Sequence, residues 1–215
     1  MNKNGAPLRP GTRRRAASPG KGGPLVSFDT HTNTDDNTMA LTPELASAAL
    51  ELINREGKAP SEADLARGAV IDTNIVLDLL WWHDPHGEAL LEAVRSGELV
   101  SLAGRETLVE LADVLTRTNF MGEEAPEKVL AALGEWISLS RVLPDEELEA
   151  AARGIHVQCR DPLDQKFLVV AFAAKAPLLL SKDKLVLKAG RRLGRTGTKT
   201  MSLTDWNRQR EKASA

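Results

Sequence analysis

Two aspartates follow apolar runs that have the character of buried strands. Asp72 comes directly after residues 69–71, and Asp183 follows residues 177–181 with only Lys182 between. Apolar runs separated by helical segments of about ten or more residues indicate a parallel sheet. The carboxyl ends of parallel strands meet at one edge of the sheet, where helix N-termini and loops converge. We therefore expect these two carboxylates to lie together.

Three further acids occupy helix positions where a carboxylate has either a structural or a chemical role. Asp161 and Asp164 stand at the start of the most apolar predicted helix, residues 163–175, where the helix dipole favours negative charge. Each is a helix cap or a metal ligand. Glu110 lies in a predicted helix, residues 105–117, on a stretch that otherwise faces the core. It is a solvated helix residue or a carboxylate that needs a partner.

A cluster of carboxylates is costly unless a cation neutralises it. Mg²⁺ and Mn²⁺ take oxygen ligands and keep several waters, which leaves positions for a phosphate oxygen and an attacking water. The implied chemistry is phosphodiester hydrolysis with one or two ions, which polarise the phosphoryl group and lower the pKa of bound water. The single cysteine, Cys159, excludes a thiolate metal cluster and an internal disulfide.

Basic residues surround Asp183, which is the only acid between residues 182 and 199. Such a stretch is a solvated loop or, beside an acid cluster, a set of phosphate contacts, and we favour the contacts. Asn74 either orients Asp72 or a metal-bound water, or caps a turn. The candidate substrate-binding residues are Asn74, Lys182, Lys184, Arg191 and Arg192, with Lys188, Arg195 and Lys199 in the same stretch.

The hydrophobic pattern predicts an α/β protein with three layers, α/β/α, around a central, mainly parallel sheet. An amphipathic helix over residues 42–55, with Thr42 as N-cap and Gly57 beyond its end, precedes the main domain. The other predicted helices are residues 86–96, 105–117, 125–138, 163–175 and 184–189, and the predicted strands are residues 69–71, 99–103, 141–143, 177–181 and 200–203.

The chain divides into four predicted regions. These are a disordered basic and polar extension (1–41), the amphipathic helix and a linker (42–68), the main domain (69–208) and a tail (209–215). The extension is too poor in apolar residues to order itself, and is a solvated tail or an arm that touches RNA. No apolar run is long enough to span a bilayer, and no apolar block follows the N-terminal arginines as a secretory signal requires, so we expect a cytoplasmic protein without membrane contact.

Four segments in this order resemble the PIN-domain ribonucleases, specifically the bacterial group that serves as toxins of toxin–antitoxin pairs. Residues 70–74 (VIDTN) resemble the family's first strand and acid, and residues 106–111 (ETLVEL) its helical glutamate. Residues 159–168 (CRDPLDQKFL) resemble the segment with the third acid, and residues 180–184 (LSKDK) the strand end with the fourth. The resemblance covers about residues 69–206.

This resemblance implies RNA cleavage that depends on Mg²⁺ or Mn²⁺, a homodimer, and a cognate antitoxin protein as partner. It implies that the catalytic carboxylates and main metal ligands are Asp72, Glu110, Asp164 and Asp183, with Asp161 as a neighbouring ligand. Gln165 departs from the family pattern, in which another polar or acidic residue often stands at this position. The pattern does not include residues 1–66, so the N-terminal extension has no counterpart.

Other interpretations compete with a metal nuclease. A phosphatase of the haloacid dehalogenase type requires a second aspartate two residues after the first, where this chain has Asn74. A domain that binds RNA or a partner protein without cutting would use the same basic stretch. The helix over residues 42–55 packs on its own domain, extends a dimer or contacts an antitoxin. We expect Trp81 and Trp82 in the core or a dimer interface rather than stacked on bases.

Overall fold

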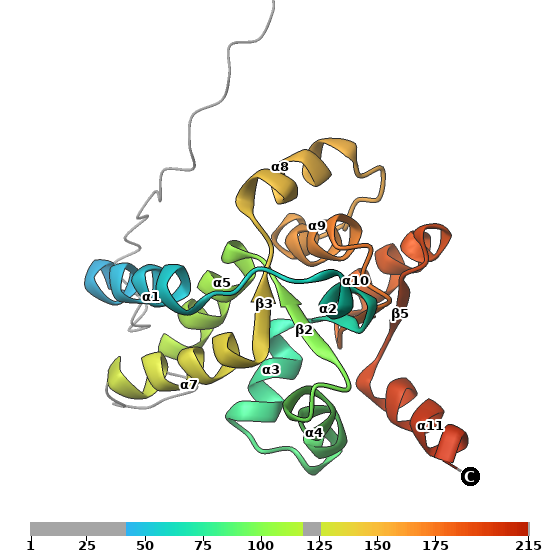
Figure 1. Cartoon of the computed structure of the whole chain (residues 1–215), viewed down its shortest axis with the longest axis horizontal. Coiled ribbons are helices and arrows are strands. Elements are labelled where there is room, and N and C mark those ends of the chain that lie inside the picture. The colour runs from blue at the N-terminus through green and yellow to red at the C-terminus, as the bar shows by residue number, and fades with distance from the viewer. Residues whose placement is uncertain (1–41, 118–125, 215) are drawn as a thin grey trace, which may run out of the picture. The chain divides into compact units, whose positions relative to one another are not determined.

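A parallel β-sheet forms the centre of the computed structural model, which describes residues 42–117 and 126–214 (Figure 1). These residues fall in one compact unit, Asn37–Ala215. The predicted extension over residues 1–41 lies outside the described residues, as do residue 125 of a predicted helix and residue 215 of the predicted tail.

The sheet has five strands: β1 (Gly68–Ile71), β2 (Val100–Ala103), β3 (Ser140–Val142), β4 (Leu178–Leu180) and β5 (Lys199–Met201). Their order is β3-β2-β1-β4-β5, and every neighbouring pair is parallel. β1, β2 and β4 are buried along their whole length, because helices cover both faces of the sheet. The predicted three-layer α/β/α fold with a parallel sheet is therefore confirmed.

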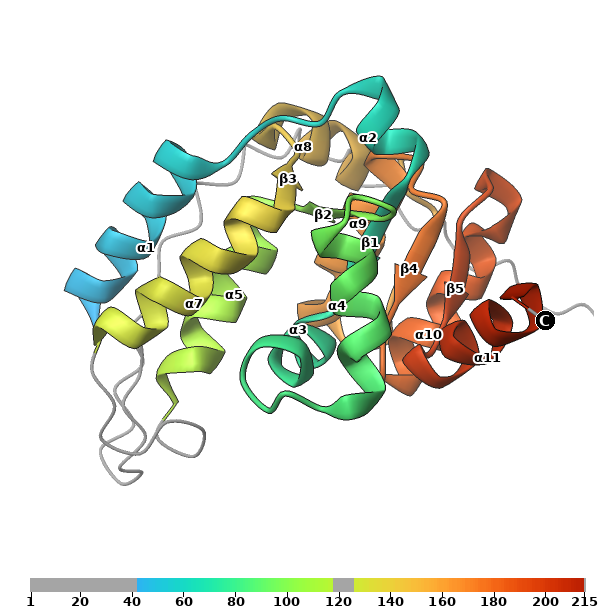
Figure 2. The same ribbon diagram turned by 60° about the horizontal axis from the view of Figure 1, so that its bottom comes forward.

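Helices lie on both faces of the sheet (Figure 2), and alternate strand residues face opposite layers. Ile71 and Leu180 join a core formed with α1 (Pro43–Glu56), α3 (Thr73–Leu80), α4 (Glu88–Arg95), α5 (Arg105–Thr116), α7 (Pro126–Leu139) and α11 (Leu203–Ser214). Val70 and Leu179 join a second core, which includes residues of α8 (Asp145–Gly154), α9 (Gln165–Ala173) and α10 (Lys184–Gly190). The sheet thus separates two cores and holds the two layers in register.

Helix α1 packs on the domain that follows it. The Thr42 hydroxyl accepts the Leu45 amide at 3.3 Å, and Pro43 begins the helix, as predicted. Leu45, Ala49 and Ile53 are buried against α5 and α7, and α1 lies beside α7 in both views (Figures 1 and 2). Packing on its own domain, one of the three roles considered for this helix, is confirmed.

Several elements differ from the prediction. Helices α2 (Glu62–Ala66), α3, α8 and α11 were not predicted, and α11 continues across the boundary drawn at residue 208 to Ser214. The helix predicted over residues 86–96 begins with a 3₁₀ turn, Pro85–Gly87, before α4. The helix predicted over residues 163–175 likewise begins with a 3₁₀ turn, Pro162–Asp164, before α9. Proline begins both turns and supplies no amide for helix hydrogen bonding there.

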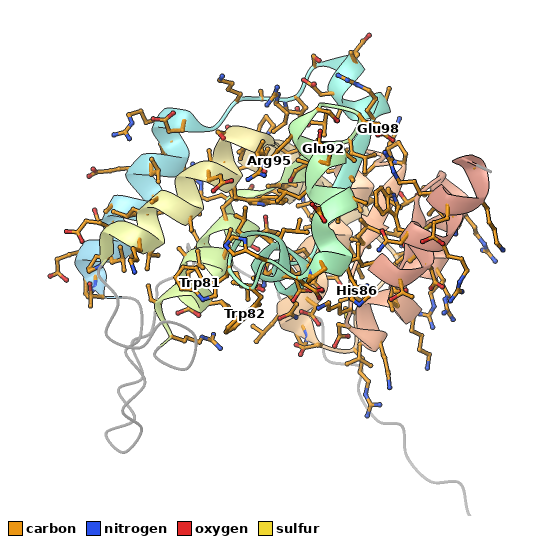
Figure 3. The ribbon with its side chains drawn as sticks, turned by 90° about the horizontal axis from the view of Figure 1, so that it is seen from below. Trp81, Trp82, His86, Glu92, Arg95 and Glu98 are labelled. Carbon is orange, nitrogen blue, oxygen red and sulfur yellow. The ribbon has the colours of Figure 1, made fainter. Side chains whose placement is uncertain are left out.

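The two adjacent tryptophans have different environments in the loop after α3 (Figure 3). Trp81 is partly buried and packs against the first core. Trp82 is 51% exposed, so the core placement expected for it is wrong, and the dimer interface remains a prediction. No helix among the described residues has the length and apolar character needed to cross a membrane.

Candidate active site

The candidate site lies where the strand order reverses. From β1 the chain adds β2 and then β3 on one side, while β4 and β5 lie on the other. Connections therefore diverge from the carboxyl ends of β1 and β4, and such divergence opens a crevice in open parallel sheets. Ile71 pairs with Leu180, so the residues that follow each strand, Asp72 and Ser181, emerge side by side.

Asp72 is a buried carboxylate that both ends β1 and caps α3. Its side chain is fixed on one oxygen by the Ser181 hydroxyl, which donates to Oδ2, and on the other by the Asn74 amide, which donates to Oδ1 at 3.3 Å. The residue is only 2% exposed. Burial raises the pKa of Asp72, and the charges of Glu110 and Asp183 raise it further, while the two hydrogen bonds oppose the shift.

Ser181 joins the two strand-end aspartates. Its hydroxyl donates to Asp72 and accepts the backbone amide of Asp183 at 2.9 Å. The Asp183 carboxylate in turn caps α10 by accepting the amides of Leu185 and Val186. Sequence analysis missed Ser181 as a site residue. The available signal was a hydroxyl at the end of an apolar strand that neighbours the strand before Asp72.

Asp164 lies in the combined field of the other acids. Burial, followed by the charges of Asp72, Asp161, Asp183 and Glu110, raises the pKa of Asp164 from 3.8 to about 6. Asp161 accepts the Leu163 amide at 2.9 Å, so it does cap the 3₁₀ turn, as one of its two predicted roles requires. Acids from four separate segments of the chain therefore act on one another at this edge.

Glu110 has a cationic partner that sequence analysis did not predict. The Lys166 ammonium, on the first turn of α9, forms an ion pair with the Glu110 carboxylate on α5. Both side chains are largely buried, with 14% of Lys166 and 26% of Glu110 exposed. Because α5 and α9 belong to opposite layers, this ion pair links the two layers at the edge where the acids meet. The ion pair also gives the partly buried Glu110 carboxylate the charged partner that it needs.

The candidate substrate-binding residues do not all gather around the acids. Lys182 pairs with the buried Asp78 of α3, and Lys184 is exposed on the first turn of α10. Asn74 is exposed, and it is its backbone amide that contacts Asp72. Arg191 and Arg192 lie beyond the far end of α10 and line a cavity whose wall contains none of the candidate acids.

The donor set suits a hard divalent ion in charge and in chemistry, since it consists of carboxylate oxygens that repel one another. As they stand, however, no three His, Cys, Asp or Glu side chains within residues 42–117 and 126–214 are grouped closely enough to hold one metal ion. Hydrogen bonds hold Asp72 and Asp183 to their neighbours, and Glu110 is turned to Lys166. Binding would therefore require some of these side chains to turn toward a shared ion.

In a parallel α/β/α domain, acids that converge at the reversal of strand order stand where such folds bind their ligands. The chain belongs to the PIN domain family, whose model matches residues 68–185, more than half of the sequence. The match begins with β1, ends in α10 and includes each of the candidate acids. PIN domains are generally nucleases, and they typically use divalent metals. No curated protein matches the chain.

Proposed function

We propose that the protein is a divalent-metal-dependent endoribonuclease, with Asp72, Glu110, Asp164 and Asp183 as its catalytic carboxylates. The observation that carries the proposal is the mutual effect of these acids. Four segments distant in sequence bring them so close that, after burial, the charges of the other acids contribute to raising the pKa of Asp164 to about 6. Repulsion among clustered carboxylates destabilises the folded protein unless another charge offsets it, and a bound cation supplies that charge.

The carboxylates of Asp72, Glu110, Asp164 and Asp183 would hold Mg²⁺ or Mn²⁺, with Asp161 as a neighbour. The ion would supply Lewis-acid polarisation of the phosphoryl group and a more acidic water. Ser181 holds Asp72 and the start of the Asp183 segment in fixed positions, so that both carboxyl groups are oriented before substrate arrives. Lys184 and Asn74 are exposed beside these acids and would contact the RNA backbone.

Lys182 has a different place in this arrangement. Its ammonium is paired with Asp78, so it holds the segment between β4 and α10 against α3. A phosphate that approached Asp183 would compete with Asp78 for the same ammonium. We therefore propose that Lys182 contacts substrate only when it releases Asp78.

The test is cleavage of labelled single-stranded and structured RNA by the purified chain with Mg²⁺ or Mn²⁺. We expect Asp72→Asn to abolish cleavage and keep the wild-type circular dichroism spectrum. Asp145→Asn is the matched control, because Asp145 is exposed and pairs only with Arg105 among the described residues. Wild-type rates in the Asp72 variant, or no cleavage by the wild type with either metal, would overturn the proposal.

The same assay separates the second candidate, a domain that binds RNA or a partner without cutting it. That role gives a shift in RNA mobility with no cleavage product in the presence of either metal.

The toxin role and a homodimer are proposed from the resemblance of residues 70–184 to toxin nucleases. A small reading frame for an antitoxin directly upstream of the gene supports the toxin role, and light scattering of the purified protein measures the oligomeric state.

A further inference from the structure

Basic side chains form a continuous stripe that starts beside the candidate acids. Lys184 and Lys188 of α10 and Arg191, which directly follows that helix, are spaced at intervals of four and three residues, so they share one helical face. The chain continues as a 3₁₀ helix, Arg191–Thr196, in which residues three apart eclipse, so Arg192 and Arg195 lie on one side. The five side chains are exposed, and the sequence contains no acid between residues 184 and 204.

The stripe ends at a cavity of about 610 Å³, here called the arginine pocket. Its charged wall consists of Arg191, Arg192 and Arg195, with His156 near them, and Phe172 contributes the aromatic part of an apolar wall. The 3₁₀ helix begins close to the sheet. Gly190, the residue directly before it, is so near β5 that a Cβ atom added there would lie 2.6 Å from Thr200. The pocket is therefore built by packed elements: the end of α9, the 3₁₀ helix and the segment after α8.

The charges in this pocket are unbalanced. No carboxylate lines it, and within the described part of the chain no ion pair or hydrogen bond engages the side chains of Arg191, Arg192 or Arg195. Guanidinium groups that converge without an acid repel one another, and their forked donors match phosphate oxygens. Phe172, which is partly buried, adds an aromatic ring to the wall, and bases stack on aromatic side chains. Phosphate recognition and base stacking together describe a nucleotide unit.

We propose that the arginine pocket binds a phosphate and base of the single-stranded RNA substrate at a distance from the cleavage site. The identity of the ligand as substrate rests on the proposed function. A helical rise of about 1.5 Å per residue puts Arg191 roughly 12 Å from Asp183, or about four nucleotides at a stacked spacing of 3.4 Å. Lys184 and Lys188 cover this interval. Their continuity with the acids favours an RNA strand over a free nucleotide or an acidic peptide.

The test measures RNA binding in a background that is not expected to cut. The full chain with Asp72→Asn is titrated into a fluorescent single-stranded RNA of twelve or so nucleotides, at several salt concentrations. We expect Arg191→Ala with Arg195→Ala to weaken binding about tenfold or more, and to reduce the slope of log K against log salt by about 0.7, the loss of one phosphate contact. Phe172→Leu should weaken binding up to about tenfold at every salt concentration, because stacking is not ionic.

The matched control is Arg55→Ala with Arg208→Ala, which removes the same two charges from exposed positions on α1 and α11. Equal losses of RNA affinity in both double variants would show that only the net charge matters, and would overturn the proposal of a binding pocket. Unchanged binding in the pocket variant would also overturn it. A glutamate-rich peptide that displaces RNA as well as an equal length of unlabelled RNA would assign the pocket to an acidic protein segment instead.

Failure of the pocket and failure of the nuclease proposal give different results. If the wild type cuts RNA but the pocket variant binds normally, the pocket is rejected and the nuclease stands. If the wild type never cuts but the pocket variant loses RNA binding, the nuclease is rejected and the pocket stands as an RNA-binding site. Unchanged thermal unfolding of the double variants shows that either result concerns binding rather than folding.

Discussion

Ser181 illustrates what a single hydroxyl contributes at the site. It is fully buried, and it is placed between Asp72 and the Asp183 amide by the pairing of β1 with β4. Without it, the buried Asp72 carboxylate loses one of its two hydrogen-bond donors, and the Asp183 amide loses its acceptor. The side chain therefore supports both the stability of the fold and the position of the carboxylates.

Replacing this hydroxyl should have a measurable cost. We expect Ser181→Ala to lower the free energy of unfolding by about 1–3 kcal/mol, because it leaves buried polar groups unpaired. Urea denaturation measures the change. Ser138→Ala is the control, since Ser138 is exposed and bonds only the carbonyl of its own helix turn. Equal stability of the two variants would show that Ser181 has no special role.

Asp164 should make stability depend on pH in a definite direction. Its pKa in the folded state is about 6, above the ordinary 3.8, so the folded state binds the proton more tightly. The stabilisation by that proton is complete at about pH 4 and is lost as pH rises through about 6. Relative to the wild type, Asp164→Asn should therefore gain stability between these limits. Because Asp164 is partly exposed, we expect a gain on the order of 1 kcal/mol.

Urea denaturation of both proteins in buffer without divalent ions tests this expectation across the pH range. The difference between the two proteins isolates Asp164 from groups whose pKa changes in the opposite direction, such as Asp64, whose pKa is lowered by hydrogen bonds from Ser61. A difference in stability that stays constant with pH would contradict the raised pKa.

At the residue scale, sequence predicted the acids but not their partners. Asp72 and Asp183 were predictable because each follows an apolar strand and so has a known place in a parallel sheet. Ser181 lies 109 residues from Asp72, and their contact depends on which strands are neighbours. The Lys166–Glu110 pair depends on the rotation of two helices in different layers. Neither contact can be predicted from the spacing of residues along the sequence.

At the scale of elements, α1 extends the domain beyond the family match. The match begins at residue 68, but α1 buries Leu45, Ala49 and Ile53 in the same core as β1. Ser61 forms a capping box with Asp64 at the start of α2, which fixes the path between α1 and the sheet. Residues 43–66 are therefore structural parts of the compact unit.

A substitution that leaves a cavity under α1 tests whether this helix is part of the domain. Ile53 is 3% exposed, and we expect Ile53→Ala to reduce the free energy of unfolding by about 2–5 kcal/mol, because the core closes only partly around the missing atoms. Glu51→Ala, on the exposed side of the same helix, should change it by less than about 0.5 kcal/mol. Chemical denaturation provides both values. A loss below about 1 kcal/mol for Ile53→Ala would mean that α1 is only loosely attached.

The elements that sequence analysis missed share a physical reason. Helix α3 buries six of its eight residues and follows β1 after only Asp72, so its apolar residues and those of the strand resemble one continuous segment, and its polar residues, Asn74 and Asp78, give only a short helical period. Helix α8 buries only Ala151, and the apolar contacts of α11 come from Leu203 and Trp206 at its start. Apolar positions so few give only a weak helical signal. The strands were predictable because sheets covered on both faces require continuous apolar runs.

At the scale of the whole molecule, a divalent ion should stabilise the fold by offsetting the repulsion among the acids. An ion at a hundred times its dissociation constant adds about 2.7 kcal/mol, or a rise in Tm of about 5–10 °C for a chain of this size. Differential scanning fluorimetry with Mg²⁺ or Mn²⁺ measures the rise, which should be much smaller in Asp72→Asn. A matching rise with NaCl at the same ionic strength would indicate general screening instead of a bound ion.

The position of Asp72 in the middle of the sheet has a consequence for local unfolding. The amide of Asp72 donates to the Leu180 carbonyl at 3.0 Å, between the interior strands β1 and β4. The amide of Lys199, which lies on the edge strand β5, donates to the Pro177 carbonyl. Deuterium exchange at Asp72 should therefore require opening of the whole domain and match the slowest amides, while Lys199 exchanges sooner through local fraying. Fast exchange at Asp72 would contradict this. Slow exchange at Asp72 would mean that the segment after β1 keeps its geometry for as long as the protein remains folded.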